Sequence, residues 1–502
     1  MSGSTQTPSS AGSPPPATKK GGRWWRAVVP FAIAIIIALL PAPAGLQQFS
    51  WYYFAIFVGV IAALVLEPLP NPAVGVIGIS LVAALAPWVL ESPAELAKPG
   101  FNRVGEAAKW ALGGFSSTTV WLIGAAFMFA TGYEKSGLGR RIALTLVKKL
   151  GKHTLSLGYA NVAIETLLAI VTPSNSARGA GAVFPIVSQL PPIYKSMPND
   201  PSRRLIGSYV MYTAFVANTI TSTLFVTGCA PNFLALEFAR RLAKVDVSWT
   251  QWFLASAPFA LPLLLLMPLI VYLIYPPQQK RSPEVSVWAA EQLHEMGPFS
   301  HRELKLSIIV VCAVLLWIAG DKWLDSSMVA FLAMSAMLVT GVLTWNDMAK
   351  NHAAWTCVML LATMVTMATG LAKVGFVKWF ATFSAAHLGG MDPTMTMMAL
   401  ITVYFVSHYF FASLTAHTSA MFPVMLGVGL GLPGLPVDKL VLGLALTTGI
   451  MGVISPYATG PALPYYNCGY MKPAEFWGMG LLFGALFLAA LLFIGLPVMM
   501  MY

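Results

Sequence analysis

The feature that most constrains this 502-residue chain is a series of apolar stretches, each near the length needed to cross a lipid bilayer. A helix rises about 1.5 Å per residue, so about 20 apolar residues span the hydrocarbon core. About eleven stretches approach this length, near residues 27–45, 50–66, 72–90, 118–133, 206–226, 252–275, 306–320, 327–344, 354–371, 440–454 and 476–500. With a mean hydropathy of +0.71 and 10% charged residues, the chain is expected to be an all-α polytopic membrane protein in a lipid bilayer.

The net charge of +11 does not indicate binding to nucleic acid, because the basic residues gather in loops, where they set membrane orientation. Residues 1–26 are rich in Ser, Thr, Pro and Gly, contain no acid and end in a basic cluster. We expect a disordered N-terminal tail that stays in the cytoplasm. A bacterial inner membrane fits this pattern, and a plastid inner envelope is the alternative, since transit sequences are also Ser-rich and acid-poor.

Two charged intervals organise the rest of the chain. Residues 135–152 carry basic side chains at helical spacing with no acid, which is typical of an amphipathic helix at the cytoplasmic surface. The polar interval 276–304 is expected to be a cytoplasmic linker between two halves, 27–275 and 305–502. The four cysteines show no metal-ligand spacing, so no metal site is expected.

Three motifs occur once in each half, in the same order and at nearly the same spacing. ATGYEKSG (130–137) matches ATGLAKVG (368–375), and PSNSARGAGAVFPIV (173–187) matches ASLTAHTSAMFPVML (412–426). A Thr-Gly pair at 227–228 answers another at 459–460. This pattern predicts two inverted repeats, an arrangement that transporters commonly use.

In each half the serine motif lies between apolar stretches that are too short to cross a membrane. About 15 helical residues cover about 22 Å, against a hydrocarbon core of about 30 Å. The sequence therefore predicts re-entrant hairpins near 155–190 and 394–430. Non-helical backbone at membrane depth must be surrounded by protein or by a water-filled cavity, so both hairpin tips are expected to line a polar site.

The two tips share the pattern Ser-x-Ser/Thr-Ala-basic. Its members are Ser174, Asn175, Ser176 and Arg178 in the first tip, and Ser413, Leu414, Thr415 and His417 in the second. Hydroxyls, an amide and helix N-terminal N–H groups are donors that suit carboxylate oxygens. Ser and Thr also cap and pack helices in membranes, but a basic residue repeated at the same place favours an anion site.

Further candidates flank the tips. Glu165 is either the ion-pair partner of Arg178 or a proton-coupling carboxylate. A broken helix after the first hairpin, with a counterpart in the second half, is expected to supply Thr221, Ser222, Thr227, Gly228, Thr459, Gly460 and Pro461. Asn218 belongs either to this group or to helix packing. His408 either supports the site or forms only a local hydrogen bond.

From about residue 27 onward, the chain resembles the divalent anion/sodium symporter family. The resemblance rests on TPSNSARGAGAVFPI (172–186) and FFASLTAHTSAMFPV (410–424), which look most like the exchanger branch of bacterial citrate/succinate and tartrate/succinate antiporters and plastid 2-oxoglutarate/malate translocators. It implies a homodimer whose scaffold domain supports a transport domain that moves as an elevator, with substrate carboxylates held by both hairpin motifs.

Two departures from the family pattern bear on mechanism. Leu414 stands where the family's motif has asparagine, so the two ends of the site should not bind the substrate equally tightly. Arg178 and His417 stand where sodium-coupled members have small uncharged residues close to the sodium sites. A fixed guanidinium repels a cation and supplies the charge that sodium would bring, so no sodium or other cofactor is expected.

These features lead to one main hypothesis and two alternatives. The chain is expected to be a transporter, not an enzyme, that exchanges di- or tricarboxylates of the succinate, malate, 2-oxoglutarate, tartrate or citrate class. A sodium- or proton-coupled symporter of the same fold is the alternative. A membrane-embedded enzyme is more remote, because most of the 19 acidic residues lie in loops.

Overall fold

A computed structural model describes residues 24–319, 323–388, 390 and 392–501. Over these residues the chain is helical and has no strand; one isolated bridge joins His153 to Arg281. The expected all-α fold is confirmed, and each apolar stretch coincides with at least one helix. Most of the predicted N-terminal tail lies outside the described residues. Its predicted end at residue 26 is wrong, since the first helix already begins at Trp25.

The elements of the first half, with η marking 3-10 and π turns, are α1 (Trp25–Leu39), α2 (Gln48–Leu66), α3 (Asn71–Ala84), α4 (Ala86–Val89), α5 (Pro93–Leu96), α6 (Arg103–Leu112), η1 (Gly113–Ser116), α7 (Thr118–Ser136), α8 (Leu138–Leu150), α9 (Thr154–Ala169), η2 (Ala177–Val183), α10 (Phe184–Val187), α11 (Leu190–Ile193), η3 (Pro201–Arg204), α12 (Gly207–Leu224), η4 (Val226–Gly228), α13 (Ala230–Phe238), η5 (Ala239–Ala243) and α14 (Trp249–Ile274).

The remaining elements are α15 (Pro283–Glu295), α16 (His301–Ala319), α17 (Ser326–Val339), α18 (Trp345–Ala349), α19 (His352–Lys373), α20 (Phe376–Leu388), α21 (Pro393–Ser407), η6 (His408–Phe410), α22 (Leu414–Gly431), α23 (Val437–Ile450), η7 (Met451–Val453), α24 (Ala462–Asn467), α25 (Pro473–Ala490), η8 (Leu491–Gly495) and α26 (Leu496–Met499).

Within the described residues, five helical segments are long and apolar enough to cross a membrane by length and composition: α2, α14, α19, α22 and α25 with its continuation to Met499. A sixth arises if Arg103–Ser116 and α7, bent by 41°, form one span. Proline interrupts the pattern without ending the helix in α14, which continues through Pro258, Pro262 and Pro268. The helices shorter than a full span include α1, α3 and α17.

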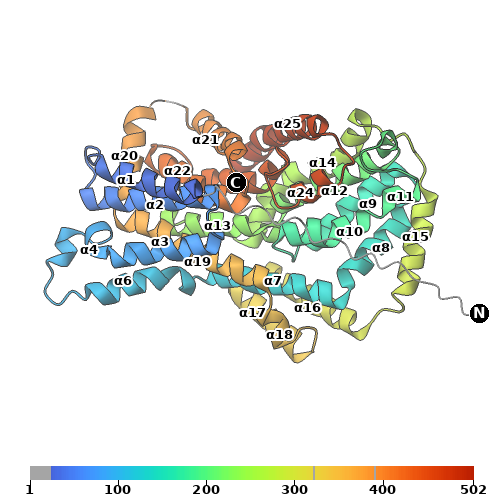
Figure 1. Cartoon of the computed structure of the whole chain (residues 1–502), viewed down its shortest axis with the longest axis horizontal. Helices are drawn as coiled ribbons and strands as arrows, with labels where there is room; N and C mark the ends of the chain where they lie inside the picture. The colour runs from blue at the N-terminus through green and yellow to red at the C-terminus, as the bar shows by residue number, and fades with distance from the viewer. Residues whose placement is uncertain (1–23, 320–322, 389, 391, 502) are drawn as a thin grey trace, which may run out of the picture.

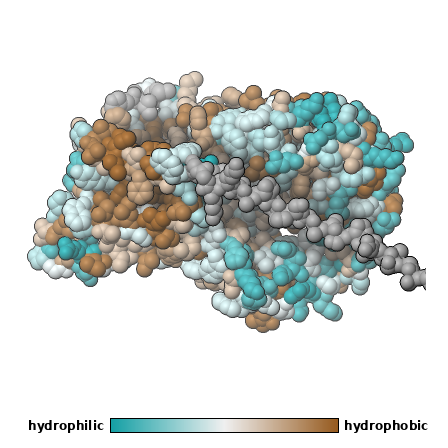
Figure 2. Space-filling view, viewed as in Figure 1, coloured by the Kyte–Doolittle hydropathy of each residue, from teal (hydrophilic) through white to brown (hydrophobic). Residues whose placement is uncertain are grey.

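The helices form an elongated molecule in which α1–α4 and α6 lie at one end of the long axis and α8, α11 and α15 at the other (Figure 1). Hydrophobic residues gather on the α1–α2 end of the face in Figure 2, and hydrophilic residues gather toward the α15 end. Most of the basic stretch 135–152 forms α8, whose apolar face, including Ala143, Leu144 and Val147, is buried, whereas Lys135 belongs to the end of α7. The expected linker contains α15, which packs against α8.

The repeated ATG motif occupies similar local structure in both halves. Gly137 and Gly375 follow α7 and α19 with φ of 80° and 79°, a left-handed conformation that glycine adopts without steric cost. The helix glycines of the motif lie against neighbouring helices, because a Cβ on Gly132 would lie 3.1 Å from Met337 Sδ and one on Gly370 would lie 1.9 Å from Tyr53 Oη. The motif therefore allows close packing and then a sharp turn.

The two serine motifs lie at breaks between helices, as expected, but the arms differ. In the first half α9 leads to a non-helical stretch and then to the π turn η2 and the four-residue α10. In the second half α21 and η6 lead to α22. The expectation of a short second arm is wrong for α22, which spans 18 residues and is apolar enough to cross a membrane, because it begins at Leu414 within the motif itself.

Candidate functional site

The site is built around Arg178, whose side chain is fully buried in the π turn η2. A π turn widens the helix by one residue and is frequent at functional sites. The guanidinium Nε donates to Glu165 Oε2 at 2.7 Å. Its Nη1 donates to the carbonyl oxygens of Thr172 at 3.0 Å and Gly228 at 2.9 Å. The terminal group is thus held by three different segments of the chain.

The other terminal nitrogen completes an all-oxygen cage. Arg178 Nη2 contacts Ser222 Oγ at 3.2 Å and Thr221 Oγ1 at 3.4 Å. A carboxylate, two carbonyls and two hydroxyls are the ligands that a hard cation such as Na⁺ or Ca²⁺ would use. In this protein the guanidinium fills the cage, so the positive charge is covalently attached.

The break after α12 brings these oxygen atoms to Arg178. Every residue of α12 is buried, which makes this helix the inner axis of the site. The amide of Asn232 donates to the carbonyls of Ser222, Phe225 and Val226 at 2.7–3.3 Å, so the broken backbone is not left unsatisfied. A Cβ on Gly228 would lie 2.5 Å from the Thr221 carbonyl oxygen, so the turn requires glycine.

A side-chain hydrogen bond joins the first tip to the second half of the chain. Asn175 Nδ2 donates to Thr459 Oγ1 at 2.8 Å. Asn218 holds the same tip from α12, because its Nδ2 donates to the Asn175 carbonyl at 3.2 Å and to Glu165 Oε2 at 3.0 Å. Asn218 was expected either to belong to the site or to pack helices, and the structure shows it in direct contact with the first tip.

The hydroxyls of the first tip remain partly accessible. Ser174 Oγ accepts a hydrogen bond from the Ala177 amide at 3.1 Å, and both Ser174 and Ser176 are half-buried. Gly460 faces the tip at close range, since a Cβ there would lie 2.1 Å from Ser176 Oγ. Pro461 also lies close to the first tip, because a Cβ on Gly179 would lie 3.2 Å from the Cβ of Pro461.

The second tip is more apolar. Ser413 Oγ accepts from the Ala416 amide at 3.4 Å and caps α22, Leu414 is buried, and Thr415 is half-buried. His417 is fully buried with Nε2 2.9 Å from Ser407 Oγ.

Aromatic rings surround the imidazole of His417. Tyr404, Phe411 and His408 lie with ring centroids 4.5, 4.8 and 4.9 Å from it. The hydrogen-bond partners of the two basic side chains therefore differ in kind. Arg178 contacts several oxygens, whereas His417 is bonded to the hydroxyl of Ser407.

A continuous chain of contacts runs from one basic residue to the other. Arg178 bonds Glu165, Glu165 bonds Asn218, Asn218 bonds the Asn175 backbone, and the Asn175 side chain bonds Thr459. The carbonyl of Ala458, the residue before Thr459, accepts a hydrogen bond from His408, and the ring of His408 contacts that of His417. The two motifs, far apart in sequence, thus belong to one network.

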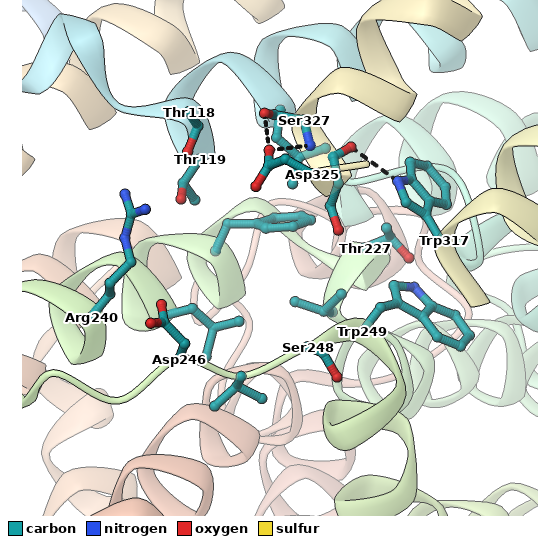
Figure 3. A pocket seen from close by; sticks show the side chains of 16 residues that line it. Thr118, Thr119, Thr227, Arg240, Asp246, Ser248, Trp249, Trp317, Asp325 and Ser327 are labelled. Atoms are coloured by element: carbon teal, nitrogen blue, oxygen red, sulfur yellow. Dashed lines mark hydrogen bonds between the residues drawn. The ribbon is translucent and has the colours of Figure 1, made fainter. Parts of the chain in front are cut away.

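Thr227 is the member that lies apart from this network. Its Oγ1 donates to the carbonyls of Ala169 and Ile170, at 3.1 and 2.7 Å, and so caps the open end of α9. It also lines a cavity of about 160 Å³ together with the first turn of α7, α13 and the start of α14. Figure 3 shows Arg240 and Asp246 on one side of this cavity and Trp249 and Trp317 on the other.

A larger cavity of about 760 Å³ lies toward the opposite end of α7. It reaches Arg178 and Thr172 at its inner end and Arg140, Gln189 and Met296 elsewhere on its wall. Because the residues of α7 that line it run from Phe127 to Glu134, the two cavities lie at different ends of the same helix. Each reaches a different part of the site.

Sequence reasoning missed the groups that hold the site from behind. Asn232, Tyr465, whose Oη donates to the Gly179 carbonyl at 3.2 Å, and the backbone of Thr172 were not singled out. Only Asn232 had a signal, since it follows proline just after the broken helix. The remaining contacts depend on chain crossings that no local pattern encodes.

Comparison with known proteins places this geometry in a family. Residues 21–501 match the family described as "Sodium:sulfate symporter transmembrane region". The chain therefore belongs to this family. Such a match covers nearly all of the sequence, and its members are membrane transporters, so the protein is a multi-pass membrane protein and not an enzyme.

Two named relatives are similar to this chain in sequence over nearly its whole length. The chain is 47% identical to the L-tartrate/succinate antiporter of Escherichia coli K12 over 95% of this chain and 98% of that protein. It is 46% identical to the protein of the same name from Shigella sonnei, with the same coverage. The fold is similar to that of the Alcanivorax borkumensis YdaH transporter, with a TM-score of 0.55, 15% identity and coverage of 86% of this chain and 99% of that one.

Proposed function

We propose that this protein exchanges one small dicarboxylate for another across the membrane without sodium. The observation that carries the proposal is the buried guanidinium of Arg178 inside a cage of oxygen ligands. A cation that is part of the protein cannot be released at either side of the membrane. The site is thus built for a carrier whose driving force is the counter-substrate and not a sodium gradient.

The partly accessible hydroxyls of both tips supply the binding groups. Ser174, Ser176, Ser413 and Thr415 are half-buried, and α22 presents its N-terminus at the second tip. Hydroxyls and helix N-termini stabilise carboxylate oxygens by hydrogen bonds and by the helix dipole. The two tips together suit a substrate with a carboxylate at each end, such as succinate or tartrate, and the relatives' names support this class.

Leu414 makes the two ends unequal. The first tip contributes an amide through Asn175, already bonded to Thr459, whereas the second offers the buried side chain of Leu414 at the corresponding place. We propose that the first tip fixes one carboxylate in orientation and the second tip tolerates variation at the other. An exchanger that must accept two different substrates benefits from such tolerance.

The protein is further proposed to work as a homodimer in a bacterial inner membrane, with its N-terminus in the cytoplasm and with one helical body moving as an elevator against another. These proposals rest on the family resemblance and on the basic N-terminal segment. A sodium- or proton-coupled symporter is the competing candidate. The filled oxygen cage disfavours sodium, and the bonding of Glu165 to Arg178 disfavours a freely titrating carboxylate.

Counterflow in proteoliposomes tests the proposal. Vesicles loaded with unlabelled succinate are expected to take up labelled succinate and tartrate in sodium-free buffer, and vesicles without internal dicarboxylate are expected to take up neither. Uptake into empty vesicles that is driven by an inward sodium gradient would establish a symporter instead. The same assay at several external pH values separates proton-driven uptake from exchange.

A further inference from the structure

His408 connects the second tip to a distant segment of the chain. It lies in η6, between α21 and the tip, and is fully buried. Its Nε2 is 2.8 Å from the carbonyl oxygen of Ala458. Because a carbonyl oxygen can only accept, the imidazole carries its proton on Nε2 and donates. The bond spans 50 positions of sequence, so His408 does not serve as a local cap.

The residue beside His408 holds the same segment. The carbonyl of Tyr409 accepts a hydrogen bond from Tyr457 Oη at 3.1 Å. Two adjacent residues of η6 thereby hold two adjacent residues of the irregular segment between η7 and α24. Within that segment the backbone bonds are sparse and include Ala458 N to the Ser455 carbonyl at 3.3 Å, so its position depends on these outside contacts.

The next residue, Thr459, accepts the hydrogen bond of the first tip. Asn175 Nδ2 is 2.8 Å from Thr459 Oγ1. The methyl group of Thr459 packs against Gly452, where a Cβ would lie 3.2 Å from Thr459 Cγ2. The threonine is thus fixed on one side by helix packing, and its backbone is fixed by the bond between His408 and the preceding carbonyl.

We infer that His408 is a positioning residue for the substrate site. By holding the Ala458 carbonyl it places Thr459 Oγ1 where the amide of Asn175 can reach it, and so couples the geometry of the second tip to that of the first. The inference rests on the proposed function, because it assigns the coupled tips to one substrate. A hydrogen bond weakens steeply once its geometry is lost, so a small shift of the segment would release Asn175.

Two substitutions separate the hydrogen bond from the ring. His408→Phe keeps an aromatic ring against His417 but removes the donor, whereas His408→Gln supplies an amide N–H that can reach the Ala458 carbonyl. In succinate counterflow, His408→Phe is expected to raise the apparent KM about tenfold, the effect of losing about one buried hydrogen bond. His408→Gln is expected to return KM to within about threefold of the native protein. His352→Phe, at an exposed position on α19, is the matched control.

Coupling to the first tip distinguishes positioning from general destabilisation. If His408 acts through Thr459, then adding His408→Phe to Asn175→Ala should raise KM less than about twofold beyond Asn175→Ala alone. The inference would be overturned if the increases in KM multiply in the double variant. It would also be overturned if His408→Gln is as impaired as His408→Phe, or if His408→Phe has the native KM.

Thermal unfolding of the purified proteins gives a readout that does not require transport. The native protein, the two single variants and the double variant form a cycle in which the losses in Tm should be non-additive. If native protein shows no succinate counterflow, the proposed function fails, and this cycle still decides whether the two positions are coupled. If His408→Phe does not assemble, Tyr457→Phe replaces it in the cycle, because it loosens the same segment at an exposed position. The losses in Tm are again expected to be non-additive, and additive losses would overturn the inference.

Discussion

The Arg178 guanidinium lies 2.7 Å from the Glu165 carboxylate, and neither side chain is exposed. Taking both charges out of water is costly, and further bonds offset part of that cost, although Glu165 Oε1 has no hydrogen-bond partner among the described residues. Arg178 has the carbonyls and hydroxyls of its cage, and Glu165 accepts a second bond from Asn218. The two side chains form a neutral unit, so we expect Arg178 to contribute a fixed charge distribution at the first tip and not a net positive charge.

Breaking this pair should damage both stability and transport. Arg178→Ala leaves the Glu165 carboxylate buried without its partner, at a cost of about 3–5 kcal/mol. Replacing both residues by apolar ones of similar volume, Arg178→Met with Glu165→Leu, should recover most of the thermal stability but not counterflow. Native counterflow in Arg178→Ala, measured at equal protein amount in the vesicles, would contradict the role given to the arginine.

Emptying the cage should also change its response to cations. In Arg178→Ala the carbonyls and hydroxyls that contacted the guanidinium are left without it, and Glu165 supplies a negative charge beside them. We expect sodium chloride, but not choline chloride, to raise the Tm of this variant, because Na⁺ binds such oxygen ligands. The native protein should respond equally to the two salts, and an equal response in the variant would show that the oxygens do not form a cation cage.

Gly460 offers a test of the contact between the first tip and the second half. A Cβ at this position would lie 2.1 Å from Ser176 Oγ, so Gly460→Ala must displace the Ser176 side chain. We expect at least about a tenfold loss of kcat/KM for succinate with little loss of stability, since displaced catalytic or binding groups cost that much or more. Gly478→Ala on α25, where nothing lies within 4 Å of the added carbon, is the control and should exchange normally. Equal activity of the two variants would refute the contact.

Glu237 links α13 to the start of α7 beside the smaller cavity. Its buried carboxylate accepts from Ser117 Oγ at 2.9 Å and Thr119 Oγ1 at 2.8 Å, and pairs with Arg240 and Arg241 at 2.7 and 2.6 Å. If α13 moves past α7 during transport, the two hydroxyl bonds must break while the arginine pairs move with the carboxylate. The hydroxyls are therefore expected to stabilise the observed arrangement.

Removing the two hydroxyls tests this latch while the buried Glu237 carboxylate keeps its pairs with Arg240 and Arg241. Ser117→Ala with Thr119→Val should depopulate the observed conformation about tenfold, given about 0.5–1.5 kcal/mol for each bond. Faster hydrogen–deuterium exchange at the start of α7 and an altered turnover number are the expected signs. Thr118→Val, at the exposed neighbouring position, should leave both unchanged. Unaltered exchange at α7 in the double variant would remove the latch from the mechanism.

Asp347, in the first turn of α18, is expected to give the protein a defined acid response. The backbone N–H and hydroxyl of Thr344, followed by Lys135 at 3.2 Å, lower the pKa of Asp347 to about 2. Because the folded pKa is below the ordinary value near 3.9, the stabilisation is complete above about pH 4 and is lost as pH falls toward about 2. The Tm of the native protein should exceed that of Asp347→Asn near neutral pH, and the difference should shrink over this window. A constant difference would contradict the assignment.

Some of the fold and site was predictable because it depends on local chemistry. The apolar stretches predicted helices, since a buried backbone must satisfy its own hydrogen bonds. The motif around Ser174 predicted a break with a basic residue behind it, and the structure has the π turn and Arg178 there. The arm lengths were less accessible, because α22 begins inside the second motif and so gains a turn that apolar periodicity alone did not show.

Other parts depended on which segments meet. The structure shows Glu165 paired with Arg178, and it places Thr227 as a cap on α9 instead of in the network around Asn175. His408 illustrates the same limit, since a histidine near a helix end usually bonds nearby, whereas this one reaches Ala458. Sequence patterns report on the environment a residue needs, but not on its partner.

By itself, the amino-acid sequence determined that this chain forms apolar helices with two polar interruptions, each carrying hydroxyls and one basic side chain. The physical reason is that hydropathy and helix-breaking residues act over a few positions of chain. Only the tertiary structure decided that Glu165 neutralises Arg178, that Thr459 accepts a hydrogen bond from Asn175, and that the two interruptions form one network. Those outcomes depend on side chains that are distant in sequence sharing a buried space, where an unpaired polar group is costly.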